Sequence, residues 1–297
     1  MIYDVFHNGT EFVVITQQSK HKELGWENVQ CTHGNTTVYI KKGRFCDMVY
    51  FDGKTYSVNT FPKYKDEIIM TTILLNEDDY IIQWIEFHMK LGVTRFVLYD
   101  NGRNPLKKDS VRRDVGYYGI RKTSQLNELL QWYIIRGIVL IIDWPFSALF
   151  QPSSQAHALN AFRQARYIGF LDVDEYVNSK VPLTVAFPKT CNHGGFRLLS
   201  KFFHNPDNKP EYGYDFLNIY TCEKEPKKNS YEKAFVHPPN VRIYCIHQIS
   251  VGKPLVVRND MYMNHYIFLN KPNRGREKVD GYDDSLTFKE CVIHLSS

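Results

Sequence analysis

The sequence predicts an α/β fold preceded by a small β-rich region, and three observations support this prediction. From residue 66 onward, apolar runs of strand length alternate with helical patterns, as they do in βαβ units. Residues 1–65 instead contain short β-branched or aromatic runs separated by turn signals. One buried run, residues 168–171, ends abruptly in carboxylates, and open α/β sheets place their ligand sites at such strand ends. We therefore divide the chain into a β-rich region, residues 1–65, and an α/β domain, residues 66–297.

The composition is that of a globular protein and excludes several classes of partner. Hydrophobic residues make up 43% and charged residues 23% of the 297 residues. The net charge of +5 suits an anionic ligand such as a nucleotide, but no stripe of Lys and Arg argues for nucleic acid. No apolar run is long enough to cross a membrane, and the start lacks the features of a signal peptide. We expect no integral membrane segment and a cytoplasmic location.

The cysteines favour the same reducing location. All six are scattered along the chain without a Cys-x-x-Cys pair: Cys31, Cys46, Cys191, Cys222, Cys245 and Cys291. In a chain of this length, the pattern is more typical of free buried thiols than of a disulfide framework or a zinc site.

The β-rich region contains strand patterns but no catalytic constellation. Runs at residues 11–15, 36–40 and 48–51 are β-branched or aromatic. Asp52 and Gly53 form the two-residue signal of a hairpin that continues into residues 55–58. We expect a small β module that packs on the α/β domain or extends it.

A β-α-β unit opens the α/β domain. Residues 68–75 read as a buried strand, Asn76 as an N-cap, residues 77–91 as a helix and residues 95–100 as a second strand. The acidic helix start at Glu77 would repel a pyrophosphate, so this loop suits the base and ribose of a nucleotide. Asn76 and Asp100 could offer hydrogen bonds there, or serve only as a cap and a strand-end turn. His88 on the helix reads as a satisfied core histidine.

The middle of the chain adds a basic segment, a helix, a third strand and another helix. Residues 103–124 are basic, which fits a solvated loop or a lid over an anionic ligand. The patterns then predict a helix over 126–135, a buried strand over 138–144 and a helix over 153–166. Gln155 lies at the head of the last helix and points towards the same sheet end as Asp172. It is a candidate ligand contact, with simple solvent exposure as the alternative.

The carboxylates after residue 171 suggest a metal site. Asp172 and Asp174 are one residue apart, so both can aim hard oxygen ligands at one divalent cation that holds a diphosphate. His247 or His265 could add a nitrogen ligand, and a later basic cluster that includes Arg274 could neutralise phosphate. The alternatives are an acidic turn, core-edge histidines and a solvated C-terminal helix.

Several segments together resemble the glycosyltransferase family 92 group. The similar motifs are Leu75-Asn76-Glu77, Trp84-Ile85-Glu86-Phe87-His88, Leu91-Gly92-Val93, Tyr99-Asp100-Asn101-Gly102, Gln155, Phe170-Leu171-Asp172-Val173-Asp174-Glu175-Tyr176, Val236-His237-Pro238 with His247, and Asn264-His265-Tyr266 with Arg274-Gly275. Their order and spacing are more specific than any one of them. The resemblance covers about residues 68–278. It implies a GT-A fold, a Rossmann-like α/β sandwich with a mixed central sheet that binds a nucleotide-sugar.

The resemblance also implies roles for individual residues. The nucleotide and donor would contact Asn76, Glu77, Asp100, Gln155, Asp172 and Arg274, and the Asp-x-Asp motif, Asp172 and Asp174, would bind Mn²⁺ or Mg²⁺ with His247 or His265 as a later metal or phosphate contact. A UDP-sugar is the favoured donor, and an oligosaccharide or glycoprotein glycan is the acceptor. The segment between Phe203 and Lys233 is shorter than in animal members, and we expect no membrane anchor of the kind that those members carry.

The family looks inverting, which requires one general base near the acceptor hydroxyl. The candidates are Asp207, Glu211 and Asp215. Asp207 is preferred because it follows the end of a predicted strand.

Three other functions compete with the transferase. A nucleotidyltransferase of similar fold would show a glycine-rich, basic phosphate loop after the first strand, whereas residues 75–79 are acidic. A phosphohydrolase with the same carboxylate motif would carry it on its first strand rather than at mid-chain. A non-catalytic carbohydrate-binding protein would use the abundant Tyr and Trp for stacking, and would bind free glycan without nucleotide or metal.

Overall fold

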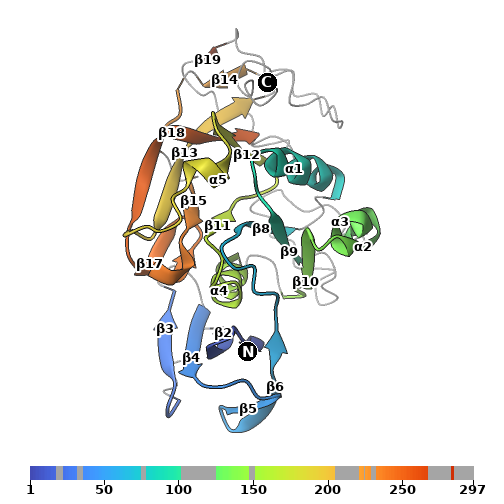
Figure 1. The fold of residues 1–297 in the computed structure, drawn as a ribbon, viewed down its shortest axis with the longest axis vertical. Coiled ribbons are helices and arrows are strands. Elements are labelled where there is room, and N and C mark those ends of the chain that lie inside the picture. The colour runs from blue at the N-terminus through green and yellow to red at the C-terminus, as the bar shows by residue number, and fades with distance from the viewer. Residues whose placement is uncertain are drawn as a thin grey trace, which may run out of the picture.

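The computed structural model describes residues 1–17, 23–31, 36–74, 78–101, 125–146, 151–204, 221–223, 225–228, 232–266 and 282–283. Within these residues the protein is α/β with mixed sheets, and a β-rich region precedes the α/β part (Figure 1). The predicted fold class is therefore confirmed at this level.

The N-terminal region forms a five-stranded sheet and a separate hairpin. Its strands are β1 (Ile2–His7), β2 (Glu11–Gln17), β3 (Glu27–Gln30), β4 (Thr36–Lys42), β5 (Met48–Phe51), β6 (Lys54–Ser57) and β7 (Asn59–Thr60). The sheet has the order β3-β4-β2-β1-β7, and β5 pairs with β6. Asp52 and Gly53 join β5 to β6 with φ of 48° and 76°. Two positive φ values are those of a type I′ turn, so the predicted hairpin is confirmed.

The α/β part begins with parallel strands. These are β8 (Ile68–Leu74), β9 (Arg95–Asp100), β10 (Val139–Asp143) and β11 (Tyr167–Phe170), arranged in the order β10-β9-β8-β11. The chain therefore builds outward from β8 to β10 and then returns to the other side of β8. Between β8 and β11 the strand order reverses, and such a switch point opens a crevice at the carboxyl ends of the strands.

Later strands extend this sheet to ten strands and make it mixed. They are β12 (Glu175–Ser179), β13 (Gly195–His204), β14 (Thr221–Glu223), β15 (Lys233–Val236), β18 (Leu255–Tyr266) and β19 (Tyr282–Asp283), while β16 (Val241–Cys245) and β17 (Gln248–Gly252) form a hairpin. β15 runs antiparallel to β11, and β12 runs antiparallel to β18. Gly195, at φ of 136°, lies where an added Cβ would stand 2.1 Å from the Phe235 carbonyl oxygen, so only glycine fits this crossing.

The three predicted helical regions are present with shifted ends. They are α1 (Asp78–Lys90), α2 (Leu126–Leu129), α3 (Gln131–Ile135), α4 (Gln151–Ala161) and α5 (Leu183–Ala186), with a 3₁₀ turn at Pro238–Asn240. The single helix predicted over 126–135 is two short helices that meet at Leu130. The helix predicted over 153–166 begins two residues earlier and ends at Ala161.

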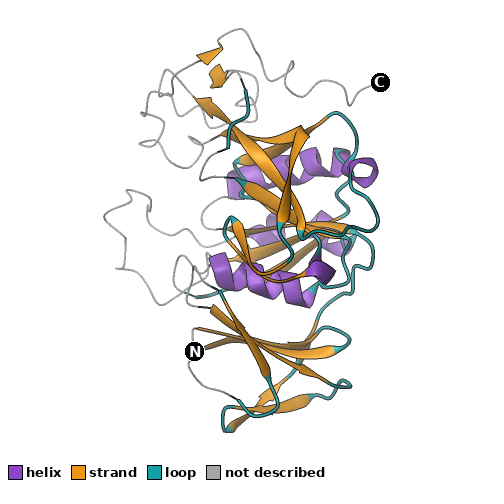
Figure 2. Ribbon diagram, turned by 90° about the vertical axis from the view of Figure 1, so that its left-hand side faces the viewer, coloured by secondary structure: helices purple, strands orange, loops and turns teal. Residues whose placement is uncertain are grey.

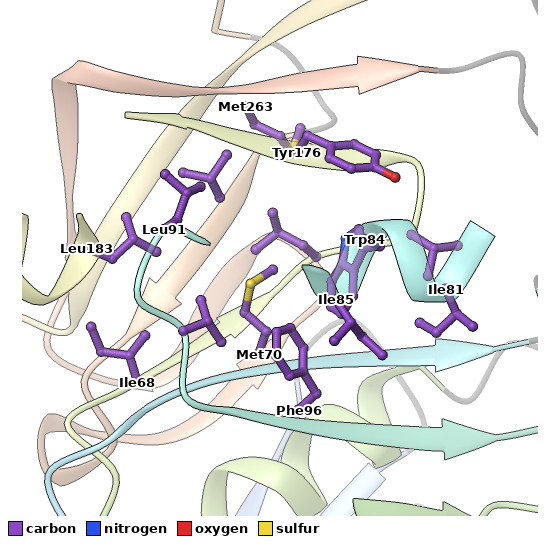
Figure 3. Close-up of a cluster of buried hydrophobic side chains, with 14 of the residues drawn as sticks. Ile68, Met70, Ile81, Trp84, Ile85, Leu91, Phe96, Tyr176, Leu183 and Met263 are labelled. Carbon is purple, nitrogen blue, oxygen red and sulfur yellow. The ribbon is translucent and has the colours of Figure 1, made fainter. Parts of the chain in front are cut away.

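Helix α1 packs its apolar side against the central sheet (Figure 3). Trp84 and Ile85 meet Phe96 and Met70 in a buried cluster. His88 is fully buried on the same helix: its Nδ1 donates to the Trp84 carbonyl at 2.8 Å and its Nε2 accepts the Val177 N–H at 3.2 Å. The prediction of a satisfied core histidine is confirmed. Burial lowers the pKa of His88 to about 3, so the ring is neutral.

Helix α4 lies between the N-terminal sheet and the central sheet (Figures 1 and 2). Phe6 and Val13 of the N-terminal sheet share one buried cluster with Leu159 of the helix and Ile168 of β11. Because both sides of α4 are covered, its polar residues are buried as well as its apolar ones. The boundary at residue 65 stays a prediction, since the core is continuous across it.

A buried hydrogen-bonded chain crosses this interface. His157 on α4 bonds through Nε2 to Asp4 Oδ2 at 2.8 Å and through Nδ1 to the Tyr99 hydroxyl at 2.7 Å. Asp4 belongs to β1 and Tyr99 to β9, so three elements of the two parts meet here. Glu11 and Arg242 add a bidentate ion pair nearby, at 2.9 and 3.2 Å. We infer that the N-terminal sheet is fixed to the α/β part by polar contacts as well as by apolar packing.

The cysteines correct one expectation. Cys31 and Cys245 are joined in a disulfide across 214 residues, whereas Cys46 and Cys191 are free thiols. The prediction of free thiols was wrong for the first two because their proximity arises from packing of the two parts, which sequence spacing does not show. None of the described helices has the length and apolar character needed to span a membrane.

Candidate functional site

A pocket opens at the switch point between β8 and β11. It is lined by Thr71, Thr72, Ile73, Gln151, Ser154, Gln155, Phe170, Leu171 and Asp172. These residues come from the carboxyl ends of the two strands and from the start of α4. Ligands of open α/β sheets bind at this place in the topology. The pocket therefore lies where the sequence predicted a ligand.

The strand ladder brings three further groups together beside this pocket. Glu175, the first residue of β12, is the register partner of His265 in β18. The Tyr266 N–H donates to the Asp174 carbonyl at 2.8 Å, which holds Asp174 at the same end of the ladder. On the other side, Trp84 of α1 donates its indole N–H to the Glu175 carbonyl at 3.0 Å. Main-chain contacts from two elements thus fix the backbone that presents these side chains.

Asp174, Glu175 and His265 form a buried group that could hold a metal ion. One ligand atom from each lies within 4.8 Å of the others. Asp174 Oδ2 lies 3.6 Å from His265 Nε2, and Glu175 Oε1 lies 3.8 Å from His265 Nδ1. Ion–ligand distances near 2.0–2.5 Å allow two ligands of one ion to stand up to about 5 Å apart, so the spacing fits.

The chemistry of these donors also fits a cation. The three residues are 3%, 0% and 3% exposed, respectively. Among the described residues, the buried Oε1 of Glu175 has no hydrogen-bond partner. A buried carboxylate oxygen without a donor is costly unless a cation satisfies it. Carboxylate and imidazole groups are both common ligands of divalent metal ions.

Asp172 stands apart from this group because Lys233 holds it. Lys233 Nζ lies 2.6 Å from Asp172 Oδ2 and 3.3 Å from Glu175 Oε2. Gln151 donates to the other oxygen of Asp172 at 3.2 Å. The Asp172 N–H donates to Glu175 Oε2 at 2.7 Å. The two aspartates of the Asp-x-Asp motif therefore have different surroundings, one an ammonium and the other a histidine.

The charges set the protonation states of the cluster. Burial raises the pKa of Glu175 to about 7, against the influence of Lys233. Burial also acts to raise the pKa of Asp172, but the Lys233 ammonium holds it below its ordinary value. For Lys233 burial acts to lower the pKa, yet Asp172 and Glu175 raise it well above the ordinary value. Lys233 therefore stays charged, and a cation that binds Glu175 would displace a proton at neutral pH.

Three other predicted residues are placed near the site. Gln155 is 5% exposed and lines the pocket, so it is not a simple solvent-exposed residue. Its Oε1 accepts the Ile246 N–H at 2.6 Å. Asp100 is buried at the carboxyl end of β9, opposite Leu74. His247 bonds through Nδ1 to the Glu232 carbonyl at 2.7 Å and is not in the group of possible metal ligands, whereas His265 is.

The remaining predicted residues lie outside the described part of the chain. They are Asn76, Glu77, Asp207, Glu211, Asp215 and Arg274, and the basic residues 103–124 also lie outside it.

Sequence reasoning missed Lys233 and Gln151, and it did not single out Glu175 as a metal ligand. A signal for Lys233 was present, because a charged residue directly precedes the apolar strand run at 234–236. Lysine at the head of a buried strand usually has a carboxylate partner. The partner itself could not be identified, since β15 and β11 are separated by more than sixty residues and their antiparallel register is not local.

Comparison with known proteins points to one family. The chain is 26% identical over 127 residues to a glycosyltransferase family 92 protein of Ricinus communis, which covers 41% of this chain and 19% of the relative. Family 92 proteins of Arabidopsis thaliana and Oryza sativa subsp. japonica are also 26% identical, over 38% and 36% of this chain. The chain covers less than a fifth of the length of these relatives. No family model matches the chain.

Among solved structures, the chain is similar to the inositol-1-phosphate CTP transferase from T. maritima. The identity is 10% and the TM-score 0.33, over 69% of this chain and 90% of that one. A TM-score this low carries no argument about fold or activity. The sequence relationship is informative only over the aligned part, where the chain is similar to glycosyltransferase family 92 proteins.

Proposed function

We propose that the chain is a metal-dependent, inverting glycosyltransferase that moves a sugar from a nucleotide-sugar, with a UDP-sugar favoured, to a glycan hydroxyl. The observation that carries this proposal is the buried Asp174–Glu175–His265 group beside a pocket at the sheet switch point. The family 92 relatives support the reaction class. The strand order β10-β9-β8-β11 supports a GT-A arrangement of the domain.

In this proposal the nucleotide-sugar donor binds in two subsites. Asp174, Glu175 and His265 would hold Mn²⁺ or Mg²⁺, which when bound neutralises negative charge on the diphosphate leaving group. The pocket residues Asp172 and Gln155, with Asp100 on the neighbouring strand, would offer polar atoms to the ribose and base. The position of both subsites at one sheet edge is what a nucleoside diphosphate requires.

The acceptor side of the reaction requires a base. The donor sugar develops oxocarbenium character, and inversion needs one carboxylate to remove the proton of the attacking hydroxyl. Asp207 is the proposed base, with Glu211 and Asp215 as alternatives. An oligosaccharide or a glycoprotein glycan is the proposed acceptor.

The predicted cytoplasmic location is not supported by the cysteines. Disulfides persist mainly in oxidising compartments, so the Cys31–Cys245 bond weighs against a reducing location.

Calorimetric titration with UDP, GDP and CMP, each with and without Mn²⁺, tests the proposed function. We expect one nucleotide, UDP, to bind in a manganese-dependent way to the wild type. Asp174→Ala should lose this binding. Asp143→Asn is a matched control, since Asp143 is an exposed aspartate at the carboxyl end of β10 and is not one of the three possible metal ligands.

The outcomes separate the competing functions. Binding of a nucleotide only with Mn²⁺, lost in Asp174→Ala and kept in Asp143→Asn, would support the transferase. Binding of free glycan without nucleotide or metal would instead identify a carbohydrate-binding protein and overturn the proposal. Once the base is known, hydrolysis of its nucleotide-sugars would identify the sugar.

A further inference from the structure

Lys233 contacts two of the three carboxylates of the site, and its burial is unusual for lysine. It is 3% exposed and stands at the first position of β15, where it is the register partner of Leu198 in β13. Its ammonium reaches Asp172 at 2.6 Å and Glu175 at 3.3 Å. Lysine is almost never fully buried without a paired charge. The two carboxylates supply that pairing.

Glu175 is shared between two positions in which a cation can sit. Its Oε2 faces the Lys233 ammonium, whereas its Oε1 faces His265 at 3.8 Å and has no hydrogen bond among the described residues. A carboxylate that bridges two cation positions is the arrangement found where two divalent ions sit about 3.5–4 Å apart. Here a lysine ammonium already fills one of the two positions.

We propose that the Lys233 ammonium takes the place of a second divalent cation. Asp172 then remains available to the nucleotide, and one metal position is left, at Asp174, Glu175 and His265. Asp172 accepts from Lys233 through Oδ2 and from Gln151 through Oδ1, so both oxygens are oriented before any ligand arrives. Its side chain is 36% exposed and lines the pocket. It can therefore still accept a hydroxyl of the nucleotide.

Charge balance supports one metal position. Three ionised carboxylates are neutralised by one ammonium and one divalent cation. A second divalent cation would leave the buried cluster with an excess of two positive charges, which is costly in a low-dielectric site. Without Lys233, Asp172 and the Oε2 of Glu175 would lack their cation and become ligands for a second ion. Lys233 is thus a positioning residue, and it sets the number of ions without contacting the sugar.

This inference rests on the proposed metal site, and counting bound ions tests it without any activity assay. Mn²⁺ is titrated into nucleotide-free protein, and bound ions are counted by electron paramagnetic resonance of free Mn²⁺. We expect one equivalent for the wild type and for Lys233→Arg, which keeps the charge. We expect two for Lys233→Met, and one again for Lys233→Met combined with Asp172→Asn, which restores the charge balance.

The design remains decisive if Lys233→Met folds poorly without metal. That variant is then refolded in Mn²⁺ and checked by circular dichroism, while the numbers of Mn²⁺ ions bound by the wild type and by the double variant still test the inference. Two equivalents in the wild type, or one in folded Lys233→Met, would overturn the inference. One equivalent in the wild type without any nucleotide binding would instead overturn the proposed function and leave the role of Lys233 standing.

Discussion

Two aspartate–histidine pairs in the described part of the chain, each with a buried histidine, differ in how closely they are joined. Asp4 and His157, at the interface of the N-terminal sheet, lie 2.8 Å apart, and the second nitrogen of His157 is hydrogen-bonded to Tyr99. Asp174 and His265, beside the pocket, lie 3.6 Å apart, and Glu175 lies 3.8 Å from the other nitrogen of His265. The first pair is within hydrogen-bond distance and the second is beyond it.

Under the proposed function, this difference separates a structural pair from a metal-binding pair. At the interface, each partner of His157 completes the bonding of the ring, so no third group is needed. In the cluster, the longer spacings match side chains that would share a cation rather than a proton. Under the proposed function, the same residue types would serve stability in one place and metal binding in the other, and the distances distinguish the two pairs.

The largest expected effect is on metal affinity at the Asp174–His265 pair. Asp174→Ala removes one of three proposed ligands, and we expect Mn²⁺ affinity to fall more than about 100-fold, equivalent to about 2.7 kcal/mol. Stability without metal should stay the same or rise, because a like charge leaves the carboxylate cluster. Calorimetry and thermal melts measure the two quantities. A large loss of stability with unchanged Mn²⁺ affinity would show that this pair is structural too.

At the Asp4–His157 pair we expect the opposite result, a loss of stability without a change in metal affinity. Asp4→Ala leaves the buried Nε2 of His157 without its partner, which should lower the free energy of unfolding by about 1.5–3 kcal/mol. Mn²⁺ affinity should not change, because Asp4 is not one of the three possible metal ligands. Urea denaturation and Mn²⁺ titration of the same protein give both values. A weaker Mn²⁺ affinity with normal stability would remove the distinction between the pairs.

The buried His88 gives the stability of the protein a pH dependence with which the two pairs can be compared. Because His88 has a pKa of about 3 when folded and about 6.5 when unfolded, the unfolded chain binds the extra proton between these values. Its contribution to stability is complete above pH 6.5 and falls with decreasing pH, by up to about 1.4 kcal/mol per pH unit. Urea denaturation from pH 7 to pH 4 should show this slope, and His88→Asn should flatten it. An unchanged slope in the variant would mean that another group controls the acid limb.

The smallest effect is expected at an exposed ion pair. Asp260 pairs with Arg258 at the surface, and its side chain is 64% exposed. Solvent screens such pairs, so Asp260→Asn should change stability by less than about 1 kcal/mol and leave Mn²⁺ binding unaltered. A larger effect in thermal melts would show that surface ion pairs cannot serve as the baseline for the two buried ones.

The local elements of this fold were predictable, but their partners were not. Helix α1, strands β8, β9 and β11 and the Asp52–Gly53 turn follow from apolar period, capping and turn chemistry, all of which act within a few residues. The pairing of Glu175 with His265 joins strands that are about ninety residues apart. Sequence spacing carries no register across that distance, so both histidines, His247 and His265, were equal candidates for the metal.

The burial of helix α4 on two sides was the second feature that could not be predicted from the sequence. His157 and Asn160 on α4 are polar and fully buried, because the N-terminal sheet covers the side of the helix that the central sheet leaves open. A helical pattern read alone shows one apolar face and predicts solvent on the other. The same packing of two parts explains the unpredicted disulfide between Cys31 and Cys245.

Pulsed electron paramagnetic resonance of Mn²⁺ bound together with UDP tests the central claim most directly. If Asp174, Glu175 and His265 hold the ion that anchors the diphosphate, one spectrum should contain coupling to an imidazole nitrogen and coupling to phosphorus. The nitrogen coupling should vanish in His265→Ala. Phosphorus coupling without nitrogen in the wild type would place the ion on the nucleotide alone and contradict this account of the site.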